Sequence, residues 1–119
     1  MQLEVDHDTL DEAVVVRVEG DIDSSSAEEL TSYLTTALSM ASGRPARLLV
    51  IDLQGVSFFG SAGLNAVLGC HERGAANGTA VRLVASQPEV IRPIEVTQLD
   101  NVLKLYSSLT EAAAPQTQP

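Results

Sequence analysis

The chain has 119 residues, of which 45% are hydrophobic and 19% charged, enough for one hydrophobic core and too few for two. Its formal net charge of -9 argues against direct nucleic-acid binding, because affinity for phosphate backbones comes largely from Lys and Arg. No apolar run reaches the length of a membrane span, and the acidic start lacks the basic residues of a signal peptide, so we expect a soluble, cytoplasmic protein without membrane contact.

The first third of the chain predicts a β-hairpin followed by a helix. Residues 3–6 and 13–19 have the composition of strands, and the polar stretch between them suits a turn. The segment Gly20-Asp21-Ile22-Asp23 is then expected to stop the sheet, with Asp21 and Asp23 as turn residues. A capping box, either Ser25-x-x-Glu28 or Ser26-x-x-Glu29, opens a helix that Gly43 and Pro45 end. Its apolar stripe is Ala27, Leu30, Leu34, Ala37, Leu38 and Ala41.

The middle of the chain predicts a buried strand and a second helix. Leu48 to Ile51 is a continuous aliphatic run, typical of an interior strand that is covered on both faces. A short loop is expected from Gln54 to Gly60. Helical spacing of the apolar residues then predicts a helix from Ser61 to about Ala76. Ser61 is expected to cap this helix, with its hydroxyl exposed beside the positive end of the helix dipole.

The last third predicts a strand, a short helix, an extended piece and a final helical turn. Asn77-Gly78 should end the second helix, and Thr79 to Ala85 should form the next strand. Capping boxes at Ser86-x-x-Glu89 and Ser108-x-x-Glu111 open the two helical pieces, and Pro93 should kink or delay the first. An extended piece is expected around Val102, Leu103 and Leu105. Residues 113–119, with Pro115 to Pro119 as their last part, are expected to be disordered.

Alternating strands and helices place the chain in the α/β class. We expect a mixed β-sheet of about four to five strands with packed α-helices, in a single domain that covers residues 1–112. The single cysteine, Cys70, cannot form an internal disulfide and is expected to be a partly buried thiol.

One segment carries a family resemblance. Asp52-Leu53, Val56, Phe58, Ser61, Gly63 and Leu64 resemble the signature of the anti-sigma factor antagonists, bacterial regulators of the STAS-domain family. The resemblance implies a single STAS-type domain in which Ser61 is phosphorylated by a partner kinase. It also implies that the Gly20-Asp21-Ile22-Asp23 loop belongs to the partner-binding surface. The partner-binding residues expected on this basis are Gly20, Asp21, Asp23, Gly60, Ser61, Ala62, Gly63 and Leu64.

The function implied by the resemblance is a phosphorylation-controlled binding module. The unmodified protein would bind an anti-sigma factor, itself a serine kinase, and so release a sigma factor. Phosphorylation of Ser61 would end this binding, and a phosphoserine phosphatase would restore it. No metal or other cofactor is expected, and self-association, if it occurs, should be weak.

Two positions depart from the family pattern and keep a second hypothesis open. Gly60 stands where the family usually has an aspartate, and Ala62 stands where a Ser or Thr is common. The first departure favours the alternative of a STAS scaffold or interaction module that is not phosphorylated. The second leaves Ser61 as the only hydroxyl in the motif.

Enzymatic use of Ser61 is a third hypothesis, which the sequence disfavours. Phe59-Gly60-Ser61-Ala62-Gly63 lacks the first glycine of a G-x-S-x-G nucleophile elbow. His71 lies ten residues along the same predicted helix, roughly 15 Å away at 1.5 Å per residue, which is too far for a general base. His7 has no evident orienting partner, and neither histidine has metal-site spacing. We therefore predict a protein that is not an enzyme.

Overall fold

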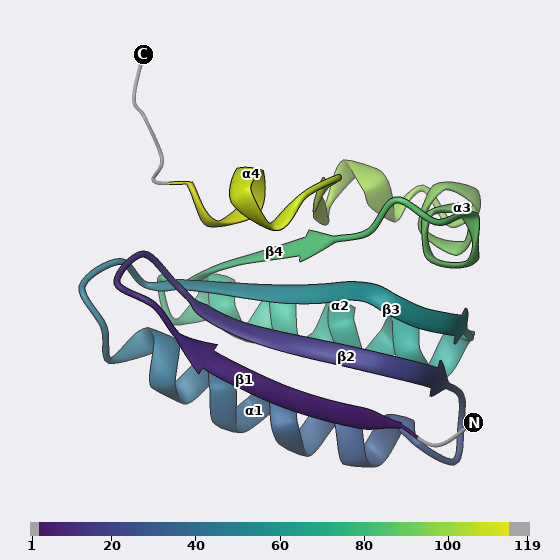
Figure 1. The fold of residues 1–119 in the computed structure, drawn as a ribbon, viewed down its shortest axis with the longest axis horizontal. Helices are drawn as coiled ribbons and strands as arrows, with labels where there is room; N and C mark the ends of the chain where they lie inside the picture. The colour runs from purple at the N-terminus through teal and green to yellow at the C-terminus, as the bar shows by residue number, and fades with distance from the viewer. Residues whose placement is uncertain (1–2, 115–119) are drawn as a thin grey trace.

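A computed structural model of the chain describes residues 3–114, which form a five-stranded sheet with helices on both faces (Figure 1). The strands lie in the order β1-β2-β3-β4-β5; β1 is antiparallel to β2 and every other pair is parallel. The expected α/β class and mixed sheet are confirmed. The elements along the chain are β1 (Glu4–Thr9), β2 (Val14–Ile22), α1 (Ala27–Ser42), β3 (Leu48–Phe59), α2 (Ser61–Ala76), β4 (Ala80–Val84), α3 (Pro88–Val96), the 3-10 turn η1 (Leu99–Asn101), β5 (Lys104–Tyr106) and α4 (Leu109–Ala113).

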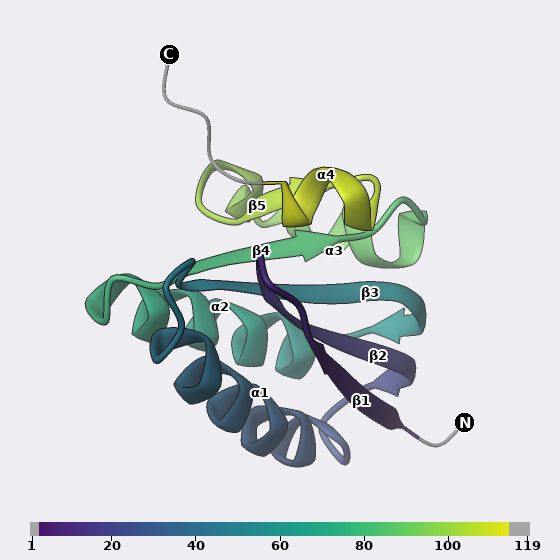
Figure 2. The ribbon, with the colours of Figure 1, turned by 60° about the vertical axis from the view of Figure 1, so that its left-hand side comes forward.

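The predicted interior strand is confirmed. β3 pairs with β2 on one side and β4 on the other, and all four residues from Leu48 to Ile51 are buried. Their side chains alternate between two hydrophobic clusters, as the twofold side-chain period of a strand requires. Leu49 and Ile51 belong to the main core, which includes residues of α1, α2 and α3, whereas Leu48 and Val50 belong to a smaller cluster that includes a residue of α4. Figure 2 shows α1 and α2 on one face of the sheet and α4 on the other.

Three strands are longer than predicted. β1 continues to Thr9, beyond the expected end at residue 6 and into the expected turn. The expected stop at Gly20 to Asp23 is wrong, because β2 continues to Ile22, and most of the expected loop from Gln54 to Gly60 is strand in β3. The extensions of β2 and β3 pair with each other across irregularities in the register, so that Asp21 lies opposite Phe58 and Ile22 opposite Phe59. Gly20 has a φ of 104° beside one of these irregularities, a conformation that suits glycine.

β4 ends at Val84, so the carboxyl-terminal part of β3 has no neighbouring strand on that side among the described residues. The Gln87 side chain binds the β3 backbone there instead. The Gln87 amide nitrogen donates to the backbone carbonyls of Leu53, Gln54 and Val56 at 2.7, 3.2 and 2.9 Å. Backbone carbonyls need partners, and this single amide supplies what a longer β4 would supply. Gln87, rather than Ser86, is therefore the N-cap residue of α3, and the expected Ser86 capping box is wrong.

Of the other expected helix starts, some are as predicted and some are not. Ser26 is the N-cap residue of α1, but its side chain makes no capping bond; the Ser26 hydroxyl donates to the Asp21 carbonyl at 2.9 Å. The predicted cap at Ser108 is confirmed, since its hydroxyl accepts from the Glu111 N–H at 3.2 Å; the Glu111 carboxylate accepts from the Ser107 and Ser108 hydroxyls. α3 starts at Pro88 and continues through Pro93 as one helix, so the expected delay is wrong.

Arg82 fixes the last helix to the sheet. It is only 5% exposed, although it is charged, and its Nη1 donates to the carbonyls of Ala112 and Ala114 at 2.8 and 2.9 Å. α4 includes Ala113, so the folded chain reaches two residues into the segment expected to be disordered. Residues 115–119 lie outside the described residues.

Leu64→Ala should destabilise the domain by about 2 to 4 kcal/mol, because Leu64 is 5% exposed in the main core and its truncation leaves a cavity. Asn65→Ala is the matched control, since Asn65 is the exposed neighbour on the same helix and should change stability by less than about 0.5 kcal/mol. Chemical denaturation measures both. Equal midpoints for the two variants would contradict the placement of Leu64 in the core.

Candidate functional site

The sequence-predicted site residues meet at the carboxyl ends of β2 and β3, on the right-hand side of Figure 1. The Gly60 N–H donates to the Ile22 carbonyl at 2.9 Å, which joins the end of β3 to the loop that leads into α1. This brings the β2–α1 loop beside the first turn of α2. We define the Ser61 surface as the exposed or half-buried residues of this region, Asp21, Asp23, Phe58, Gly60, Ser61 and Ala62.

Ser61 is the first residue of α2 and is exposed, as predicted. The expectation that it caps the helix is wrong. Gly60, in an extended conformation, is the N-cap residue, and no side chain makes a capping bond there. The first intrahelical bond runs from the Leu64 N–H to the Gly60 carbonyl, so the N–H groups ahead of Leu64 are left for solvent or a ligand. The Ser61 hydroxyl therefore lies at the positive end of a helix whose first turn has no acidic residue.

Two predicted partner-binding residues lie beneath this surface. Gly63 and Leu64 are buried, and a Cβ on Gly63 would lie 2.4 Å from Ile22 Cγ2. Glycine at this position lets α2 approach the end of β2 closely, which sets the position of Ser61. Gly20 is also buried, so it contributes through its backbone, which takes a φ of 104° within β2 beside an irregularity in the register.

The two aspartates of the predicted surface are held differently. Asp23 Oδ1 accepts from the Ser25 hydroxyl at 2.6 Å and from the Ser25 and Ser26 N–H groups at 2.9 and 3.3 Å. These bonds, the Ser25 hydroxyl first, lower the pKa of Asp23 below its ordinary value. Asp23 is thus ionised and shapes its own loop. Asp21 is half-buried in the last residues of β2, and its carbonyl is bound by Ser26.

Phe58 is a surface residue that our list of partner-binding positions omitted. It is 52% exposed, whereas its neighbour Phe59 is 3% exposed. Two adjacent phenylalanines in a strand must point to opposite faces, and this period could have identified the outward ring from the sequence. Phe58 lines a hollow of about 350 Å³ with Pro88, Glu89, Arg92 and Pro93 of α3 and its buried neighbour Phe59. The Ser61 surface therefore has an apolar part beside its hydroxyl.

The groups required for serine or cysteine chemistry are not assembled around Ser61. Within residues 3–114, no hydrogen bond joins the Ser61 hydroxyl to a histidine or carboxylate. His71 lies almost three turns along α2, and its Nδ1 is buried without a partner in the described structure. Cys70 is fully buried rather than partly buried, and burial raises the pKa of its thiol to about 11. No cluster of three potential metal ligands occurs within residues 3–114.

Among the described helices, none combines the length and apolar character required to cross a bilayer.

The fold and the site together define a small α/β module with a solvent-facing serine at a helix N-terminus. A family model of the STAS domain matches residues 4–112 of the chain. The chain belongs to the STAS domain family.

Three solved structures show how far the similarity extends. An anti-sigma factor antagonist from Mycobacterium paratuberculosis is 32% identical, with a TM-score of 0.84 over 93% of this chain and 91% of that one. The anti-sigma factor antagonist SpoIIAA in its unphosphorylated form is 21% identical, with a TM-score of 0.72 over 92% of both chains. The Bacillus cell fate determinant SpoIIAA in its phosphorylated form is 20% identical, with a TM-score of 0.67 over 92% of this chain and 96% of that one. The two SpoIIAA structures show similarity of fold alone.

Proposed function

We propose that this protein is an anti-sigma factor antagonist whose binding to an anti-sigma factor is switched off by phosphorylation of Ser61. The observation that carries the proposal is the position of Ser61, exposed at the N-terminus of α2 and surrounded by the other residues of the Ser61 surface. The unmodified protein binds the anti-sigma factor, which is also the kinase, and a sigma factor is released. A phosphoserine phosphatase returns the protein to its binding form.

The comparison with known proteins supports the general role. The mycobacterial structure is described as an anti-sigma factor antagonist and covers nearly the whole of this chain. SpoIIAA, which shares the fold, has been solved in phosphorylated and unphosphorylated forms. A domain of this architecture is therefore compatible with both states.

The local structure explains how a phosphate could act without unfolding the domain. A phosphoserine carries close to two negative charges, and at a helix N-terminus these are stabilising by about 0.3 to 1 kcal/mol. The free N–H groups of the first turn of α2 face that charge, and no acidic side chain of that turn repels it. Phosphorylation therefore weakens binding rather than folding, because a partner surface that fits a neutral hydroxyl must accommodate a dianion.

The alternative of an unphosphorylated STAS scaffold is supported by Gly60. A Cβ at this position would lie 3.0 Å from Phe58 Cε2, so the Phe58 ring occupies space that an aspartate side chain would need. Gly60 thus leaves the phosphorylation motif without its usual carboxylate, and the Phe58 ring lies against that position. This aromatic surface suits constant binding as well as switched binding.

Incubation with the anti-sigma kinase and ATP, followed by a phosphate-affinity gel, separates the two proposals. We expect one shifted band for the wild type and none for Ser61→Ala. Ser57→Ala is the matched control, because Ser57 is an exposed serine only four residues away in β3 and should leave the shift unchanged. An unshifted wild type under conditions in which the kinase is active would favour the scaffold. A shifted Ser61→Ala would refute Ser61 as the acceptor.

The remaining parts of the proposal concern where the protein acts. We propose that it works in the cytoplasm as a non-enzymatic regulator that does not contact nucleic acid itself. The net charge of -9 supports the last point. Its influence on transcription passes through the sigma factor.

A further inference from the structure

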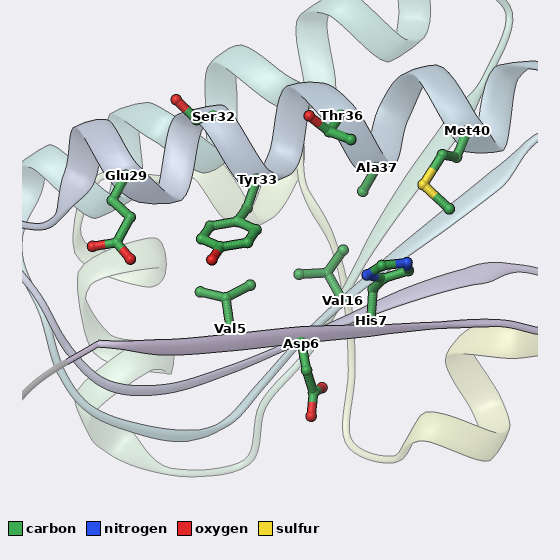
Figure 3. Close-up of a pocket in the computed structure, with 10 residues that line it drawn as sticks. All are labelled: Val5, Asp6, His7, Val16, Glu29, Ser32, Tyr33, Thr36, Ala37 and Met40. Carbon is green, nitrogen blue, oxygen red and sulfur yellow. The ribbon is translucent and has the colours of Figure 1, made fainter.

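A second concave region lies between β1 and α1, and none of the residues that line it belongs to the Ser61 surface. Figure 3 shows it as a slot with the helix on one side and the edge strand on the other. Its volume is about 400 Å³, within the range of small-molecule sites in proteins. We call it the β1–α1 slot, defined by the side chains Val5, His7, Val16, Glu29, Tyr33, Ala37 and Met40.

The interior of the slot is apolar and closed at its base. Val16 of β2 and Ala37 of α1 form the base and are 1% and 3% exposed. Val5 and Met40 are half-buried walls from the strand and the helix. The Tyr33 ring, 45% exposed, extends from α1 toward Val5, and the core does not cover it (Figure 3). An apolar or aromatic body placed beside this ring would bury its own surface and that of Tyr33.

The polar groups of the slot give it a direction and a charge. Glu29, in the first turn of α1, points its carboxylate into the slot beside Tyr33, whereas His7 lies at the opposite end near Met40 (Figure 3). Asp6 also borders the slot, but its side chain points away from it and lies 3.9 Å from Arg17. No Lys or Arg lines the slot. Its charged end is therefore negative and attracts a cation.

We infer that the β1–α1 slot binds small amphipathic organic amines, with the apolar body against Tyr33, Val5 and Ala37 and the ammonium group beside Glu29. The Tyr33 ring adds a face to which a cation is attracted. An anionic amphiphile of the same shape meets the Glu29 carboxylate and is disfavoured. A neutral one keeps only the apolar contacts.

Three probes with one body and different heads test this assignment: 4-phenylbutylamine, 4-phenylbutanol and 4-phenylbutyrate. Each is titrated into the full chain while the methyl NMR signals of Val5, Val16, Ala37 and Met40 are followed. Dissociation constants of about a millimolar or below are expected for the amine, given the size of the probe. The alcohol should bind more weakly than the amine, and the carboxylate more weakly still.

Two variants assign the contributions of the head and the body. Glu29→Gln should lower the affinity for the amine by about two- to fivefold, which is the range for an exposed ion pair. It should leave the affinity for the alcohol unchanged. Glu28→Gln is the matched control, because Glu28 is exposed in the same turn and does not line the slot. Tyr33→Ala should lower the affinity for all three probes. Thermal melting checks that this variant is folded.

Four outcomes would overturn the inference. The first two are that the methyl signals show no saturable shifts, or that the carboxylate binds as tightly as the amine. The third is that Glu28→Gln and Glu29→Gln change the affinity for the amine equally. The fourth is that the same methyl signals shift when the protein is diluted without any probe. The last outcome would place a second copy of the chain on the slot. The experiment uses no kinase or anti-sigma factor, so its result is independent of the switch at Ser61.

Discussion

Ser61→Asp should bind the anti-sigma factor about a hundredfold more weakly than the wild type, whereas Ser61→Ala should bind as tightly as the wild type. Misplaced charge at an interface costs several kcal/mol, and each 1.4 kcal/mol changes affinity about tenfold. The protein's own charge of -9 and the ionised Asp23 make local compensation weak. Calorimetric titration of the three proteins against the anti-sigma factor measures the difference.

The control for this comparison is a second acidic substitution, near the end of the strand that precedes α2. Ser57→Asp adds the same charge at an exposed position outside the residues that define the Ser61 surface, and we expect a much smaller loss of affinity. Neither Ser61 variant should melt below the wild type, because Ser61 is exposed, its side chain makes no capping bond, and negative charge is tolerated at a helix N-terminus. A loss of stability in Ser61→Asp would mean that the substitution acts by unfolding α2 rather than at the interface.

Gly63→Ala should destabilise the domain by about 1 to 3 kcal/mol, the usual cost of overpacking a core. The new Cβ would lie 2.4 Å from Ile22 Cγ2 and 3.2 Å from Phe59 Cδ1, and both of these side chains are buried. Neither can swing into solvent, so α2 must move away from the end of β2. The substitution should also weaken partner binding, because Ser61 moves with the helix.

Gly69→Ala on the same helix is the matched control, with the opposite expected sign. Its Cβ would meet only Arg73 Nη1, at 3.4 Å, which is the flexible end of an exposed side chain. Alanine is the better helix former by about 0.8 to 1 kcal/mol, so this variant should be as stable as the wild type or more stable. Urea denaturation of both variants tests the pair. A Gly63→Ala protein as stable as Gly69→Ala would contradict the close approach of α2 to Ile22.

Features that depend on local periodicity could be predicted from the sequence. The aliphatic run at Leu48 to Ile51 marked the interior strand, and the helical spacing after Gly60 marked α2 with Ser61 at its start. The helix cap at Ser108 was predicted correctly because its donor and acceptor lie three residues apart. These features are encoded by neighbouring residues and need no knowledge of the rest of the fold.

Features that depend on distant partners could not be predicted in this way. Gly20 and Asp21 have turn chemistry, yet they are strand residues because β3 lies beside them. The Ser26 hydroxyl looked like a helix cap, but it is bound to the Asp21 carbonyl. Gln87 completes a strand that lies more than thirty residues earlier in the chain. For Gly20, Asp21 and Gln87 a tertiary contact replaced the local preference, whereas the Ser26 hydroxyl found a different partner only five residues earlier in the chain.

The candidate site shows the same division. The motif identified Ser61, but it did not separate surface residues from those beneath them, and Gly63 and Leu64 are buried. Phe58 belongs to the same segment and faces outward. Its outward direction follows from the twofold side-chain period of β3, which extends through Phe58 and Phe59 where a loop was expected.

The most direct test of the central claim is the affinity of the phosphorylated protein itself. The chain phosphorylated at Ser61, its site verified by mass spectrometry, is titrated against the anti-sigma factor by calorimetry and then titrated again after phosphatase treatment. We predict binding about a hundredfold weaker than that of the unmodified protein, a difference of roughly 2.8 kcal/mol, with full recovery after dephosphorylation. Equal affinities for the phosphorylated and unmodified proteins would contradict the assignment of Ser61 as the switch.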